Sequence, residues 1–210
     1  MGSYAYSQSL EAAISEGFVI NQSSAESWIG SVFIHSFSLL DLPSLLLAQK
    51  KWMLKDAEAL RALDDYLSAN RETYELHLED KEMGRALHRI LISLNLELPR
   101  VTEPSFVTMF GCAGAAWKIC PHDLATGFSF SWMENQIGIA TKTVPLGQTA
   151  NQKILSSLST LIEPRVSNVI ETHEELASLD PSQWDFGVSL QALSMLSARH
   201  EQLPSRLYRS

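Results

Sequence analysis

Apolar side chains recur every three or four positions along most of the chain. Residues 25–37 are the clearest example, and the apolar residues that follow this spacing are Ala25, Trp28, Ile29, Val32, Phe33 and Phe37. This spacing places them on one face of a helix, with Ser23 or Ser24 as its N-cap. No stretch shows the sustained alternation of apolar and polar residues that is typical of a half-buried strand. The pattern therefore predicts an all-α, single-domain helical bundle of about eight to ten helices.

Further helix boundaries follow from local signals in the first half of the chain. Asp41 is expected to cap one helix, with Pro43 tolerated in its first turn, and Asp56 is expected to cap another. A long helix is predicted over residues 72–94, and Pro104 is expected to open a helix over residues 104–120.

Two glycines interrupt the apolar pattern of residues 104–120, at Gly111 and Gly114. A glycine inside a helix costs about 1 kcal/mol relative to alanine. We therefore expect this helix to pack closely against a neighbour at both positions.

The central helix is predicted over residues 127–143, with apolar side chains around most of its circumference. Pro145 ends it, because proline lacks an N–H and excludes the helical conformation of the preceding residue. Pro145 is expected in the first turn of the next helix, over residues 148–162, while Gly147 allows close backbone approach. Gln148 then lies at a rigid polar corner.

The last part of the chain is predicted to be less regular. Residues 163–185 are acidic and contain two prolines, which favours a loose excursion. Residues 189–199 form a last apolar helix. Residues 1–198 are therefore assigned to one helical domain, and residues 199–210 to a flexible C-terminal tail that binds a partner.

Composition limits the partners that the chain can bind. Its 210 residues are 45% apolar and 19% charged, with a formal net charge of −8. The length and apolar content suffice for one domain with a sizeable core. Nucleic acid is disfavoured because phosphate binding needs a basic face.

The two cysteines indicate the compartment. Cys112 and Cys120 lie in a segment that otherwise resembles core, which favours a reducing cytoplasm over a disulfide framework. The apolar run of residues 106–117 is too short to cross a bilayer. The sequence thus predicts a cytoplasmic protein without a membrane partner.

Metal-site and catalytic patterns are weak. Sulfur and imidazole suit nickel or zinc, so Cys120 and His122 are weak metal candidates. The six histidines are spread without ligand spacing, at His35, His77, His88, His122, His173 and His200. Neither a nucleophile elbow nor a phosphate-binding glycine loop occurs, so we do not expect an enzyme.

Four glutamates with three-four spacing form an acidic stripe on the helix of residues 72–94. They are Glu72, Glu75, Glu79 and Glu82. A solvated face is the favoured interpretation, and a docking or cation-attracting surface is the alternative.

The C-terminal residues have the composition of an interface. Arg199, Arg206, Leu207, Tyr208 and Arg209 end an otherwise acidic chain. Arginine and tyrosine are enriched among interface anchors, so this end is predicted either to fray or to become ordered on a partner.

Several motifs in the same order resemble the UreF family of urease accessory proteins. They are Gly2-Ser3-Tyr4-Ala5-Tyr6-Ser7-Gln8-Ser9-Leu10-Glu11, Asp41-Leu42-Pro43, Arg71-Glu72-Thr73, Met83-Gly84-Arg85-Ala86-Leu87, Ser131-Trp132, Val144-Pro145-Leu146-Gly147-Gln148 and Ala198-Arg199-His200-Glu201 with Ser205-Arg206-Leu207-Tyr208-Arg209-Ser210. Family members usually have another helical stretch before the first motif. The resemblance therefore implies a different start site or a missing first helix.

The resemblance also implies a function. The chain would be a homodimeric scaffold that joins UreD (also called UreH) and recruits the GTPase UreG for nickel delivery to the urease apoprotein. Nickel would pass through the assembled complex, with no cofactor bound tightly by this chain. Two alternatives remain open: a regulator of GTP hydrolysis by UreG, and a direct nickel carrier.

The family's functional surfaces map onto particular residues. The resemblance implies GTPase docking at Glu11, Lys142 and Gln148. It implies binding to UreD through the tail, whose named residues are Arg199, His200, Glu201, Arg206, Leu207, Tyr208 and Arg209.

Overall fold

The computed structural model describes residues 6–99, 101–203 and 206–208. The helices are α1 (Leu10–Ser15), α2 (Gln22–Val32), the π-helical turn η2 (Phe33–Phe37), α3 (Ser38–Met53), α4 (Ala57–Asn70), α5 (Tyr74–Ser93), α6 (Phe106–Ala116), α7 (Pro121–Thr143), α8 (Gln148–Ser159), α9 (Ile162–Ser178), the 3-10 turn η3 (Pro181–Gln183) and α10 (Gln191–His200). No strand occurs within the described ranges. The predicted all-α bundle is confirmed.

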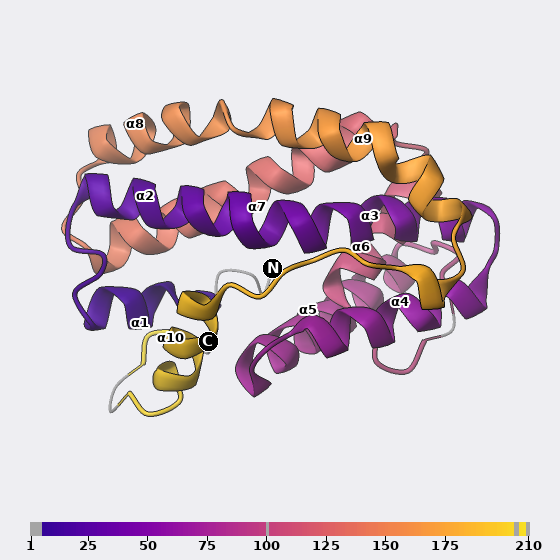
Figure 1. Cartoon of the computed structure of the whole chain (residues 1–210), viewed down its shortest axis with the longest axis horizontal. Helices are drawn as coiled ribbons and strands as arrows, with labels where there is room; N and C mark the ends of the chain where they lie inside the picture. The colour runs from indigo at the N-terminus through magenta and orange to yellow at the C-terminus, as the bar shows by residue number, and fades with distance from the viewer. Residues whose placement is uncertain (1–5, 100, 204–205, 209–210) are drawn as a thin grey trace.

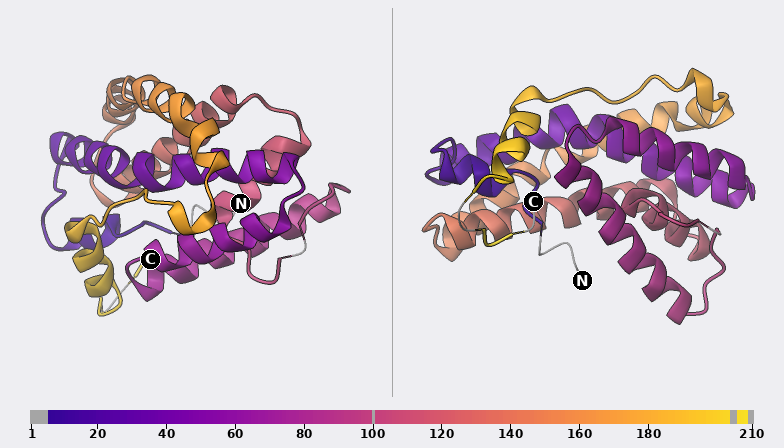
Figure 2. Two further views of the ribbon diagram at one scale, coloured as in Figure 1. Left: turned by 45° about the vertical axis from the view of Figure 1, so that its right-hand side comes forward. Right: turned by 90° about the horizontal axis from the view of Figure 1, so that it is seen from below.

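The helices surround one long central rod formed by α2, η2 and α3 (Figure 1). α3 packs against α6, α9, α4 and α7, and α5 packs against α6. α8 and α9 lie along one side of the rod, while α4 and α5 lie on the other. The segment between η3 and α10 runs along the outside of the bundle and returns the chain to α1 (Figures 1 and 2). Residues from both chain ends therefore meet.

The central rod begins earlier than the sequence predicts. Asn21 is the N-cap: its side chain accepts from the backbone N–H of Ser24, and the Ser24 hydroxyl oxygen accepts from the Asn21 N–H. The prediction of Ser23 or Ser24 as N-cap is therefore wrong. Asn21 was a weaker signal because the two serines stand closer to the apolar pattern.

Asp41 does not cap a helix, and this prediction is also wrong. Both Asp41 and Pro43 lie inside α3, and the Asp41 carboxylate pairs instead with Arg71. Proline removes one backbone hydrogen bond, but the leucines around it, among them Leu42 and Leu45, are fully buried. Their burial outweighs the local helix-breaking signal.

The rod is long and apolar enough to cross a membrane by length and composition alone. However, 72% of its most apolar 18-residue window, within Gln22–Met53, is buried inside the bundle. Among the described residues it is the single helix that passes this test, and the core helices of compact proteins pass it as well.

The predicted irregular excursion over residues 163–185 is helical as far as Ser178, so that prediction is wrong. Pro164 lies in the first turn of α9, where its missing N–H has no intrahelical acceptor. Ile162, Val166 and Val169 recur at helical spacing and are buried. The helical signal was present, and the acidic residues obscured it.

Three boundaries around the central helix also move. α6 ends at Ala116 instead of continuing to residue 120, and α7 already begins at Pro121 with Cys120 as N-cap. Val144 is extended as predicted, but Pro145 precedes α8 and does not lie in its first turn. α7 also exposes one side, including Phe130 and Glu134, so it is less buried than predicted.

Close helix packing at the two glycines of α6 is confirmed. A Cβ atom on Gly111 would lie 2.6 Å from the carbonyl oxygen of Leu45, and one on Gly114 would lie 2.5 Å from the side chain of Leu124. Both distances are below ordinary van der Waals contact, so only glycine allows this approach of α6 to α3 and α7.

Candidate partner-binding site at the chain ends

The four glutamates of the predicted stripe bind residues near both ends of the chain, although Glu72 precedes the N-cap Thr73 and only Glu75, Glu79 and Glu82 lie on α5. Glu79 accepts from the Gln8 amide at 3.0 Å, Glu82 accepts from the Tyr6 hydroxyl, and Glu72 accepts from the Leu190 N–H at 3.1 Å. The fourth member, Glu75, binds His200 and Arg206. Glu75 and Glu79 are buried. The favoured interpretation of a solvated face is therefore wrong, and the stripe is an intramolecular docking surface.

The densest part of this surface is centred on His200, which has no exposed surface. Its Nε2 atom lies 3.1 Å from Oε2 of Glu11, and its Nδ1 atom lies 2.8 Å from Oε2 of Glu75. Each ring nitrogen of His200 thus faces a carboxylate oxygen from a different helix. His200 thereby joins α10 to α1 and α5.

The tail continues the same network. The Leu207 N–H donates to Oε1 of Glu11 at 2.7 Å, and the Tyr208 N–H donates to Oε2 of Glu11 at 3.0 Å. Arg206 donates to Oε1 of Glu75 at 2.7 Å. We call Glu11, Glu75, His200, Arg206 and the backbone of residues 207–208 the tail latch.

Burial distinguishes the members of the tail from one another. Tyr208 is 8% exposed, and burial, with a smaller effect of the Glu11 charge, raises the pKa of its hydroxyl. Leu207 is 74% exposed, and Glu201 is also exposed. Arg199 forms an exposed ion pair with Glu16 at 3.0 Å. Arg209 lies outside the described residues. Buried polar contacts therefore hold the tail in place, while its other side is exposed to solvent.

The residues expected to dock a GTPase separate into two groups. Lys142 and Gln148 are exposed on either side of the corner between α7 and α8. Glu11 lies beneath the tail and is 8% exposed. The corner is at the same end of the long axis as α1 (Figure 1). The three residues share one end of the bundle, and two of them are available at its surface.

A buried ion cluster joins α3, the end of α4 and α5, and the sequence did not indicate it. Arg71 lies 2.6 Å from Oδ1 of Asp41 and 3.6 Å from Oδ1 of Asp80. Although burial opposes its charge, these two carboxylates hold the pKa of Arg71 above its ordinary value. Burial raises the pKa of Asp41, and the charge of Arg71 opposes that rise. The cluster borders a cavity of about 110 Å³ that also contacts Trp132.

The neighbouring Asp64 gives a pH-dependent prediction. Burial raises its pKa above the ordinary 3.8, so the folded chain keeps this proton at pH values where the unfolded chain has lost it. Stability therefore falls as pH rises through that window, by at most about 1.4 kcal/mol per pH unit. In Asp64→Asn the side-chain oxygen can still accept from the Ser105 N–H, which donates to Oδ1 of Asp64 at 3.0 Å. The variant should therefore lack the contribution of Asp64 to this decrease of stability with rising pH.

Urea unfolding at a series of pH values above 4 measures that slope. Asp64→Asn should gain stability relative to the parent as pH rises. Asp65→Asn, on the exposed side of the same helix, is the control and should follow the parent. Parallel curves for the parent and Asp64→Asn would refute the assignment of the buried proton to Asp64.

Comparison with known proteins decides the family. The sequence model of the family described as UreF matches residues 19–159 of this chain. The chain belongs to the UreF family. Three relatives are each described as "Urease accessory protein UreF". The one from Teredinibacter turnerae is 42% identical over 216 residues, covering 100% of this chain and 92% of the relative. Those from Marinomonas sp. and Hahella chejuensis are 40% and 38% identical, covering 100% of this chain and 88% and 92% of the relatives.

The UreF-like motifs meet in space although they are far apart in the sequence. Glu11 of the first motif and His200 of the last lie in contact. Thr73, next to the stripe, shares a hydrogen bond of 2.6 Å with Ser197, one residue before the last motif. Residues 2–5 of the first motif lie outside the described part. The contacts show that these motifs build one continuous structure.

The two metal candidates have other contacts. The Sγ atom of Cys120 accepts from the Asp123 N–H at 3.5 Å, as an N-cap of α7. His122 lies 3.2 Å from Glu163, and this hydrogen bond raises the pKa of the imidazole. Among the residues that the structure describes, no group of three metal-binding side chains is present. Cys120 and His122 therefore have no third ligand there.

Proposed function

We propose that this chain is a non-enzymatic scaffold in urease maturation. With UreD (also called UreH) it recruits the GTPase UreG, so that nickel reaches the active site of the urease apoprotein. It works in the cytoplasm as a homodimer, and nickel passes through the assembled complex. The observation that carries this proposal is the full-length similarity to urease accessory proteins named UreF.

The geometry supports a division of roles between two surfaces. Lys142 and Gln148 contact the GTPase from the exposed corner. The tail contacts UreD with its exposed side while the tail latch fixes its position on Glu11 and Glu75. Glu11 contributes to recruitment through the tail that covers it. Because both surfaces lie at one end of the bundle, one scaffold can bring the two partners together.

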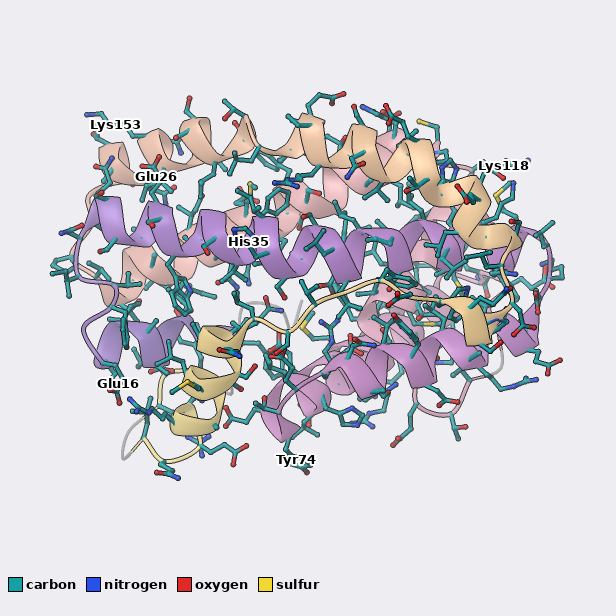
Figure 3. The ribbon with its side chains drawn as sticks, in the orientation of Figure 1. Glu16, Glu26, His35, Tyr74, Lys118 and Lys153 are labelled. Atoms are coloured by element: carbon teal, nitrogen blue, oxygen red, sulfur yellow. The ribbon has the colours of Figure 1, made fainter. Side chains whose placement is uncertain are left out.

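Urease activation tests this function in cells that lack the chain. Lys142→Ala should lower urease activity per apoprotein at least about tenfold, the loss that corresponds to 1.4 kcal/mol of binding. Lys153→Ala is a matched control, because Lys153 is exposed on α8 near the same end (Figure 3). Equal activation by both variants would contradict docking at the corner.

Two other functions make different predictions. A regulator of GTP hydrolysis would place Lys142 or a tail arginine near the nucleotide, so turnover by UreG would change when the chain is added. A scaffold alone leaves GTP turnover by UreG unchanged.

A nickel carrier would lose bound nickel in the Cys120→Ala, His122→Ala double variant. Unchanged nickel content in that variant removes this alternative.

A further inference from the structure

Three helices end at one groove, at the opposite end of the bundle from the tail latch. α3, α5 and α6 are followed by Lys55, Asn95 and Lys118, which have φ values of 58°, 59° and 55°. These three residues line a groove of about 750 Å³. Figure 3 shows Lys118 at the far end of the long axis from Glu16 and Lys153. The groove is thus separate from the surfaces discussed above.

The left-handed backbone at these helix ends would be more stable with glycine. At the end of α6, for example, the Lys118 N–H donates to Ala115 and the Ile119 N–H donates to Gly114, which is the usual glycine-terminated pattern. These positions are therefore not optimised for stability, which makes their side chains candidates for a role other than folding. Two of the three residues are lysines.

The lysines of this groove bind carboxylates. Lys50 pairs with Glu174 at 2.8 Å, and Lys55 pairs with Glu97 at 3.1 Å. Both glutamates are mostly exposed, so each ion pair contributes little to stability. A carboxylate of a partner protein can therefore replace either glutamate on its lysine. Lys118 has no carboxylate partner among the described residues.

Apolar side chains accompany these charges. The Trp52 ring lies on the groove wall with Nζ of Lys55 at 4.2 Å from its centroid. Met53 lines the groove and is 65% exposed, and Trp117, next to Lys118, is 51% exposed. Exposed aromatic and methionine side chains bordered by charges are typical of protein interfaces.

We propose that this groove binds an acidic, amphipathic helix of a partner protein. Carboxylates of that helix replace Glu97 and Glu174 on the lysines and supply one for Lys118, while its apolar face covers Met53 and the Trp52 wall. A membrane surface fits less well, because these lysines line a groove and not a flat face. This inference is independent of the partners named under the proposed function.

Selection from a displayed library of 18-residue helices tests the chemistry of the occupant with the full chain as target. The selected helices should combine leucine or phenylalanine on one face with flanking glutamate or aspartate. They should also slow alkylation of Cys120, which is exposed and lines the groove, whereas Cys112 is buried. Basic or neutral helices, or binders that leave the alkylation rate of Cys120 unchanged, would overturn the proposal. So would protection of Cys120 only by phosphatidylserine vesicles.

Two glycine substitutions separate binding from folding. Lys118→Gly and Asn95→Gly should each raise the melting temperature by about 2–4 °C, because both relieve left-handed backbone. Only Lys118→Gly should weaken binding of a selected acidic helix, by up to about fivefold for one exposed ion pair. Unchanged affinity in Lys118→Gly, or equal loss in both variants, would contradict a role for this lysine.

Discussion

Gly84→Ala is expected to lower the free energy of unfolding by about 3 kcal/mol or more. A Cβ atom on Gly84 would lie 1.9 Å from the carbonyl oxygen of Pro104 and 2.7 Å from the carbonyl carbon of Ser105. Both are backbone atoms, so relief requires α5 to move away from the start of α6, and overpacking of this kind costs at least about 1–3 kcal/mol. Ser105 is also the N-cap of α6 and binds Asp80.

Urea unfolding followed by circular dichroism at 222 nm measures this loss. Gly138→Ala is the matched control, because no heavy atom lies within 4 Å of a Cβ atom placed there inside α7. It should stabilise the chain by up to about 1 kcal/mol, the difference in helix propensity. Similar midpoints for the two variants would refute the close approach of α5 to residues 104–105.

Deletion of residues 201–210 is expected to abolish UreD binding, with an affinity loss of more than about a hundredfold, and to leave the helical fold intact. The deletion removes the ion pair of Arg206 with Glu75 and both tail N–H donors to Glu11. α10 remains attached, because His200 still binds Glu11 and Glu75. The loss corresponds to about 2.7 kcal/mol or more of binding, within the range of interface hot spots.

Titration calorimetry with UreD measures the affinity, and circular dichroism checks the fold. Arg206→Ala should reproduce part of the loss because it removes the arginine that fixes the tail to Glu75. Arg199→Ala tests a purely exposed pair with Glu16 and should change binding less. If the deleted chain loses helical signal, or still binds UreD with full affinity, the assigned role of the tail is wrong.

Helices could be predicted from the sequence wherever apolar spacing decides the structure. Residues 25–37 and Ala57–Asn70 form helices as predicted, because burial of one face stabilises both. The sequence also placed Glu75, Glu79 and Glu82 on one helix, whereas Glu72 precedes its N-cap. Their partners could not be predicted, because His200 and Glu75 are 125 positions apart in the chain.

The errors arise where tertiary contacts override local signals. Asp41 followed by Pro43 is a helix-start pattern, yet a buried partner, Arg71, draws the carboxylate into the core. Glu11 is a different case, because the docking role that the family motif implies stays a prediction, while the motif does not show that the tail covers this carboxylate. Such burial depends on residues almost 200 positions away, which no local pattern contains.

Size-exclusion chromatography with light scattering tests the scaffold most directly. The chain is mixed with UreD, then with UreG and GTP, and UreD with UreG alone is the reference. The account predicts that UreG enters a defined complex with UreD only when this chain is present, and that Lys142→Ala reduces that complex. Association of UreD and UreG without the chain, or no association of the chain with either protein, would contradict it.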